Sequence, residues 1–249
     1  MGISYRYAKY LSKLGTRMLI ALLVIDTAWT LVRFIIIHTT FGGNPPATFE
    51  ATEKIVTNSI YLTFIVILAV GMILLGFYYL RFTKFGVIAA TLLVIQVGIK
   101  IAYIFFRITE LASGITQEFL DNLIQIFDLS TTLLIIITFI TFDVFQNQLH
   151  NRAGIGYGRG PLPYLFGFFA LVYPLSNILN LANINYTESV ALIFMHLFSY
   201  IAVILQIIVY FDMLRRFDNL QPLPDEDEDS IIEIKTLKQI RAEEKESLN

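Results

Sequence analysis

The sequence predicts an all-α membrane protein, a polytopic bundle of six transmembrane helices. The first observation is composition, because the 249 residues are 56% hydrophobic and only 15% charged, whereas a soluble domain carries about 25% charged residues. The second is length, because six mostly apolar stretches each hold the roughly 20 residues that a helix needs to cross the hydrocarbon of a bilayer. The third is the placement of the basic residues, which gather in every second connection and next to the first and last stretches.

The six expected spans follow one another with short connections. In order they run from Arg17 to Thr39, Ile55 to Leu80, Phe85 to Ile108, Leu123 to Phe145, Tyr164 to Leu181 and Val190 to Leu214. The first is expected to be a retained span, because it continues into Arg33 and His38 and shows no small-residue cleavage site. On the third span, the pairs Gly86 with Ala90 and Gly98 with Ala102 would let another helix approach closely.

Orientation follows from the lysine and arginine residues near the ends of the spans. They gather at the N-terminus, in the second and fourth connections and after the last span: Arg6, Lys9, Lys13, Arg17, Arg81, Lys84, Arg152, Arg159, Arg215 and Arg216. The other connections are net acidic. Because basic residues are retained in the cytoplasm, both termini are expected there, with the chain in the cell membrane.

Both ends are expected to lie outside the bundle of residues 17–216. Residues 1–16 place Arg6, Lys9 and Lys13, followed by Arg17, at helical spacing among apolar residues, which predicts an amphipathic helix on the membrane surface. The tail, residues 217–249, carries ten acidic and four basic residues. Within it Ser230 and Glu233 form a capping-box pattern, so a short helix is expected from Ile231 to about Leu248, with a frayed tail as the alternative.

The fourth connection, residues 153–161, is dense in glycine. It lacks the Lys-Ser/Thr ending of a phosphate-binding loop, and a glycine-rich composition is typical of a flexible linker. We therefore expect a linker and no nucleotide site.

Strongly polar residues occur within all six spans, which is unusual for helices in lipid. Most lie about 10 Å from the outer ends, judged from the helical rise, whereas Asp26 lies nearer the middle of the bilayer. Asp143 and Asp212 lie near inner ends, where exposure at the interface is expected. The candidate site residues are Asp26, Arg33, Asn58, Gln96, Lys100, Asp128, Asn177 and His196.

Two interpretations of this polar layer remain open. In the first, the residues line a cavity that opens outward, where Arg33 and Lys100 meet a small polar or anionic solute and the acidic groups balance charge. In the second, they form internal ion pairs, Lys100 with Asp128 and Asp26 with Arg33, that only fix the rotation of the helices.

The sequence offers little support for an enzyme. It has no cysteine and only three histidines, so thiolate metal sites and thiol catalysis are excluded. We expect no catalytic residues, no metal ligands and no cofactor, and the scattered basic residues do not predict a nucleic-acid site.

Two functions are compatible with these observations. The first is transport or binding of a small solute, by a transporter or by the membrane substrate-binding component of a larger system. The second is a sensor or structural subunit of a membrane complex, which recruits a cytoplasmic or membrane protein partner through its cytoplasmic ends.

Overall fold

The computed structural model describes residues 3–42, 45–113, 117–181, 189–223 and 231–232. Within them the chain forms six helices and two short strands. The helices are α1 (Tyr5–Phe41), α2 (Ala47–Tyr78), α3 (Phe85–Ser113), α4 (Gln117–Ala153), α5 (Leu162–Leu181) and α6 (Ser189–Asn219), and the strands are β1 (Ile3–Ser4) and β2 (Ile231–Ile232). Apart from these two-residue strands, every described element is a helix, as predicted.

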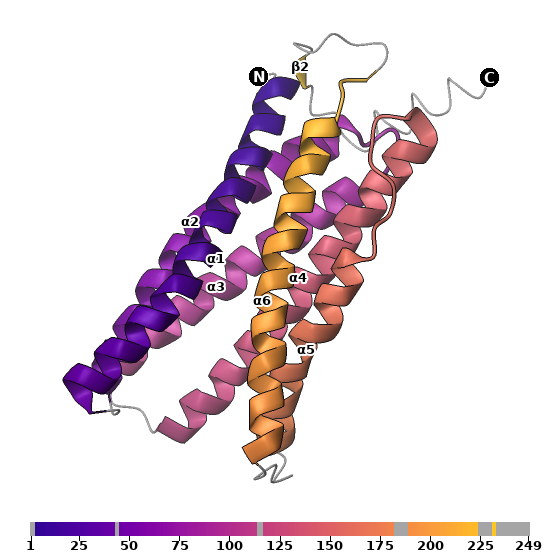
Figure 1. The fold of residues 1–249 in the computed structure, drawn as a ribbon. Coiled ribbons are helices and arrows are strands. Elements are labelled where there is room, and N and C mark those ends of the chain that lie inside the picture. Colours follow the sequence, from indigo (N-terminus) through magenta and orange to yellow (C-terminus); the bar gives the residue numbers. More distant parts are fainter. Residues whose placement is uncertain (1–2, 43–44, 114–116, 182–188, 224–230, 233–249) are drawn as a thin grey trace.

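Each helix packs against the next along the chain, and α6 also contacts α1. Figure 1 shows the start of α1 and the end of α6 at one end of the bundle, which we call the terminal end. The opposite end, where α1 stops at Phe41 and α2 begins, is the distal end. Both ends of the described chain therefore reach the same end of the bundle, as an even number of spans requires.

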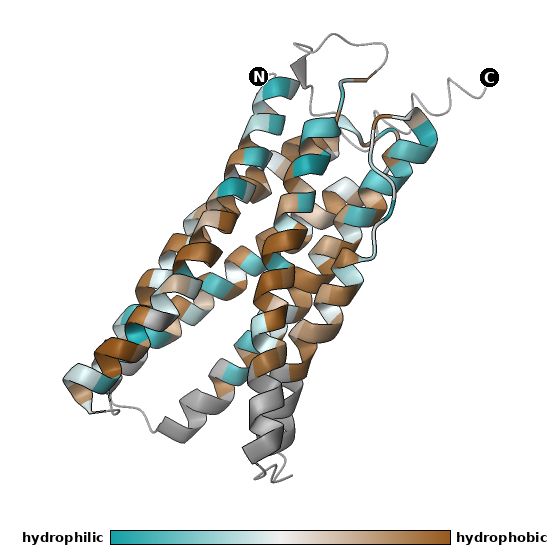
Figure 2. Ribbon diagram, viewed as in Figure 1, coloured by the Kyte–Doolittle hydropathy of each residue, from teal (hydrophilic) through white to brown (hydrophobic). Residues whose placement is uncertain are grey.

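The helices are apolar enough for a membrane. Among the described residues five helices have the length and composition to cross a bilayer, and Leu162–Val172 of α5 is a shorter apolar helix. Every predicted span lies within one helix, except that Tyr79 and Leu80 extend beyond the end of α2. Apolar residues occupy the middle of the bundle, and hydrophilic residues gather at its terminal end (Figure 2). The structure is thus compatible with a membrane helix bundle.

Glycine lets α1 and α2 touch through their backbones. A Cβ atom added at Gly15 would lie 2.6 Å from the backbone nitrogen of Leu68, and one at Gly71 would lie 2.5 Å from that of Ser12. Small residues are the usual device for close approach in lipid, where no hydrophobic force drives two helices together. The α1–α2 pair is therefore fixed in the half of the bundle that includes the terminal end.

The predicted approach to the third span is confirmed at one of its two glycines. A Cβ atom at Gly86 would lie 2.9 Å from the Cα atom of Gly76 on α2, and Ala90 is almost fully buried. At Gly98 an added Cβ would have no described atom within 4 Å. The prediction was wrong there, because α2 and α3 touch this closely only toward the terminal end.

The N-terminal segment is not a separate surface helix. Residues 5–16 form the first turns of α1, and Ser12 and Thr16 are fully buried. Lys9 donates hydrogen bonds to the carbonyl oxygens of Asp218 (3.1 Å) and Leu220 (2.6 Å), and Lys13 forms an ion pair with Asp218. The basic residues expected at the lipid surface thus include two that bind the C-terminal end of α6, where a cation is favourable.

The tail turns back toward the start of the chain. Strands β1 and β2 pair antiparallel, with Ile3 opposite Ile232 and Ser4 opposite Ile231. The predicted tail helix is therefore wrong in its first two residues, which lie in β2. Its remainder and its capping box lie outside the described residues.

The glycine-rich connection between α4 and α5 is packed, contrary to the linker interpretation. A Cβ atom at Gly156 would lie 2.5 Å from the backbone oxygen of Gln146, and Ile155 is buried. The N–H of Tyr157 lies 3.4 Å from Oε1 of Gln146. Glycine is needed at position 156 because the backbone of the connection touches the backbone of α4 there.

Candidate functional site

Lys100 lies at the centre of a cluster of polar residues in the distal half of the bundle. Its ammonium donates a hydrogen bond of 2.9 Å from α3 to Oδ1 of Asn58 on α2. The Asn58 amide is itself oriented, because its Nδ2 donates to the backbone oxygen of Lys54 at 2.7 Å. A neutral side-chain oxygen is therefore presented to the lysine.

Two tyrosine rings complete the surroundings of the Lys100 ammonium. Nζ lies 5.3 Å from the centroid of the Tyr61 ring and 5.5 Å from that of Tyr103. Both distances are within the range of cation–π attraction. The Tyr61 hydroxyl is buried and interacts with the Tyr210 hydroxyl of α6. The ammonium and the two aromatic rings thus lie close together in an otherwise apolar region.

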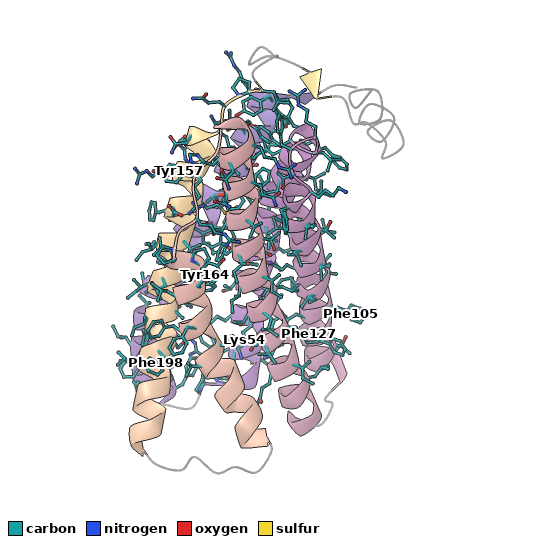
Figure 3. All side chains as sticks on the ribbon, turned by 90° about the vertical axis from the view of Figure 1, so that its right-hand side faces the viewer. Lys54, Phe105, Phe127, Tyr157, Tyr164 and Phe198 are labelled. Carbon is teal, nitrogen blue, oxygen red and sulfur yellow. The ribbon has the colours of Figure 1, made fainter. Side chains whose placement is uncertain are left out.

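Asp128 on α4 lies near this group but does not pair with it. Among the described residues no ion pair within 4 Å joins Lys100 to Asp128, so the predicted pair is wrong. The carboxylate is attracted by Lys100 and, more weakly, by Lys54 and Arg107. Figure 3 shows Lys54 in the distal half of the bundle, at a level close to Phe127. In the sequence Lys54 falls in the connection just before the second predicted span, so it was not among the candidate residues.

Arg107 extends the positive charge toward the distal end. Arg107 is buried and lies about two helical turns beyond Lys100 on α3. Its Nε donates a hydrogen bond to the Tyr103 hydroxyl at 3.3 Å. Three cations, Lys54, Lys100 and Arg107, thus act on one carboxylate, Asp128. We call these four residues the distal polar site.

Gln96 lies one helical turn from Lys100, toward the terminal end. Its Nε2 donates to the Thr138 hydroxyl at 2.8 Å, and that hydroxyl donates to the Leu134 carbonyl at 2.7 Å. Gln96 is almost fully buried. It therefore ties α3 to α4 through the Thr138 hydroxyl.

Arg33 and Asp26 do not form the predicted ion pair. The Arg33 guanidinium binds two carboxylates of α2, with Nε 2.8 Å from Oε2 of Glu53 and Nη2 3.0 Å from Oε1 of Glu50. Trp29 donates its indole N–H to Oε1 of Glu53 at 2.5 Å. These acidic residues were assigned to an outer connection in the sequence. In the structure they belong to the first turns of α2 and hold it to α1.

Asp26 lies apart from the distal polar site. It lines a pocket between α1 and α2 together with Trp29 and Glu53, and Glu53 is the charged group that acts on it. The structure therefore brings together Asn58, Lys100 and Asp128, and places Asp26 and Arg33 in a second group. Asn177 and His196 were also predicted to belong to the site, but their side chains are outside the part of the chain that the structure describes.

A buried ion-pair group near the terminal end was also missed. Nη1 of Arg216 lies 2.8 Å from Oδ1 of Asp143, and Nε lies 2.7 Å from Oδ2 of Asp212. Asp143 is only 1% exposed, so the expectation of interfacial exposure was wrong. The four-residue spacing of Asp212 and Arg216 was the available signal, but it does not reveal a partner on α4.

The described residues contain no group of histidine, aspartate and glutamate side chains arranged to hold a metal ion. Comparison of the chain with protein-family models, with curated proteins and with solved structures gave no match.

Proposed function

We propose that this membrane protein binds a small anionic solute at the distal polar site, as a transporter or as the membrane component that presents a substrate to a larger system. The observation that carries the proposal is the surroundings of Lys100. A cation within a membrane helix is usually paired with an opposite charge. Here its hydrogen-bond partner is the neutral Asn58, two tyrosine rings lie beside it, and the Asp128 carboxylate attracts it without forming an ion pair.

The chemistry of the site fits an anion with oxygen acceptors. An ammonium has three N–H donors, and Asn58 accepts from one of them. Lys54 and Arg107 add positive charge, and all three cations act on the Asp128 carboxylate. Because such groups interact strongly in a medium of low dielectric, an anion gains more here than at a water-exposed surface.

The test compares variants at the two ends of the bundle. Purified protein is screened against small carboxylates, phosphates and halides for thermal stabilisation, since a ligand of the folded state raises the melting temperature by mass action. Lys100→Gln removes the charge and keeps a polar side chain. Lys84→Gln, at an exposed position outside the distal polar site, is the matched control. We expect at least a tenfold loss of affinity in the first variant and none in the second.

The variant Asp128→Asn adds a second test, because we expect it to change the affinity for the anion in the opposite direction. The Asp128 carboxylate competes with a bound anion for the same positive charges, so its removal should tighten binding. An anion that stabilises the parent and both lysine variants equally would refute the proposal. Absence of any stabilising anion would also count against the proposal.

A second proposed function, a sensor or structural subunit, draws on a different observation. The pairing of Ile3 with Ile232 brings β1 and a segment of the tail together at the terminal end, where one partner can contact both. Deleting residues 225–249 should then release a co-purifying protein. Retention of every partner would count against this function.

A further inference from the structure

A pocket of about 350 Å³ lies between the distal halves of α1 and α2. Its walls are mainly apolar, with Ile25 and Val56 among them, and the Trp29 and Phe49 side chains contribute aromatic surface. Two carboxylates, Asp26 and Glu53, also line it. The volume lies within the usual range for sites that bind small molecules.

The two carboxylates differ in their partners. Glu53 is neutralised, because Arg33 and the Trp29 indole donate to its two oxygens. The Asp26 carboxylate forms no hydrogen bond or ion pair with the described residues, and its side chain is exposed. Asp26 is therefore the group in the pocket whose charge lacks a described counter-charge.

The pocket is separate from the distal polar site. On α2 its residues Glu53, Val56 and Ile60 follow one another at helical spacing and share one face. Asn58 and Tyr61, which contact Lys100, share another. Because every lining residue that the structure describes comes from α1 or α2, we place the pocket on the side of this helix pair that faces the lipid.

Asp26 also lies deep along the membrane normal. It follows Arg17, where the apolar part of α1 begins, by nine residues, which corresponds to about 13 Å along a helix. The hydrocarbon of a bilayer is about 30 Å thick, so Asp26 lies near its middle. A carboxylate at this depth is costly unless a cation accompanies it.

We propose that the α1–α2 pocket binds an amphipathic organic cation, an ammonium group with an apolar chain, that enters from the bilayer. The ammonium group sits beside Asp26, which supplies the complementary charge. The faces of Trp29 and Phe49 attract the same group through cation–π interactions, and the apolar walls cover the chain. This site does not depend on the anion site proposed above.

Trp29 makes the test specific, because it is the single tryptophan of the chain and it lines the pocket. The full-length protein in nanodiscs of zwitterionic lipid is titrated with octyltrimethylammonium while tryptophan fluorescence is recorded. This probe carries a permanent charge. Octanol and octanoate, which have the same chain, are the controls. We expect a saturable change with the cation and none that saturates with either control.

The variant Asp26→Asn keeps the shape of the side chain and removes its charge. We expect it to weaken binding of the cation by about tenfold or more, with no decrease in the melting temperature of the free protein, because the Asp26 side chain makes no described bond and its charge is costly at this depth. Phe49→Leu should weaken binding less. Lys100→Gln should leave it unchanged, which separates this site from the anion site. Equal affinity of Asp26→Asn and parent, or saturable binding of octanol, would overturn the proposal.

Discussion

Replacing Arg216 by methionine is expected to cause a large loss of stability. The guanidinium bonds to Asp143 on α4 and to Asp212 on its own helix, at 2.8 and 2.7 Å. The side chains of Arg216 and Asp143 are only 4% and 1% exposed. Methionine fills a similar volume without charge, so the change isolates the electrostatic contribution and leaves a buried carboxylate without its cation.

The size of the effect follows from what remains around Asp143. After the substitution, Oδ1 of Asp143 still accepts a hydrogen bond from the N–H of Gly160 at 3.2 Å, whereas Oδ2 has no hydrogen-bond partner among the described residues. Removing one partner of a buried ion pair lowers the free energy of unfolding by about 3–5 kcal/mol. Asp212→Asn should cost less, about 1 kcal/mol, because its side chain is 23% exposed and its pair is screened by solvent.

Reversible unfolding in mixed detergent micelles, followed by circular dichroism, measures these differences. The double variant Asp143→Leu with Arg216→Met replaces both charges by apolar groups, and we expect it to recover most of the loss, since buried pairs often exchange for apolar residues at little cost. Arg215→Met is the control and should cost less than about 1 kcal/mol. A loss below 1 kcal/mol for Arg216→Met, or a double variant as unstable as the single one, would refute this reasoning.

Three further predictions rest on other contacts. Gly71→Leu should separate α1 from α2 and lower the melting temperature strongly, because its Cβ would meet Ser12 at 2.5 Å, whereas Gly98→Leu should have little effect because nothing described lies within 4 Å; equal melting temperatures would contradict the packing. Thr138→Val should cost about 1–3 kcal/mol by leaving the buried Gln96 amide unpaired, and adding Gln96→Leu should restore part of it in the same unfolding assay. Since the chain has no cysteine, Lys84→Cys and Thr40→Cys can be labelled singly in intact cells with an impermeant maleimide; we expect Thr40→Cys alone to react, and the reverse pattern would invert the proposed topology.

The helices were predictable from the sequence, because span length and apolar content are properties of a local stretch. All six spans fall within helices, with an error of two residues at Tyr79 and Leu80. The close approach at Gly86 was predictable for the same reason, since small residues at helical spacing mark a face that admits a neighbour. The approach at Gly98 was not, because the same spacing does not say where two helices diverge.

The continuation of α1 through residues 5–16 was harder to predict. A basic amphipathic pattern fits a helix that lies on the membrane. The same pattern fits equally well a helix whose basic residues face the C-terminal end of another helix. Lys9 and Lys13 meet Asp218 and the last carbonyl groups of α6, which are more than 200 positions away in the chain. No local pattern contains that information.

The sequence by itself determined an apolar helical chain that carries polar residues at similar depths in its spans. The tertiary structure decided which of these residues meet. It paired Arg33 with Glu50 and Glu53, gave Lys100 a neutral amide and left Asp26 in a separate pocket. The reason is geometric: each residue turns a helix by about 100°, so depth follows from the sequence, whereas partners depend on how each helix is rotated against its neighbours.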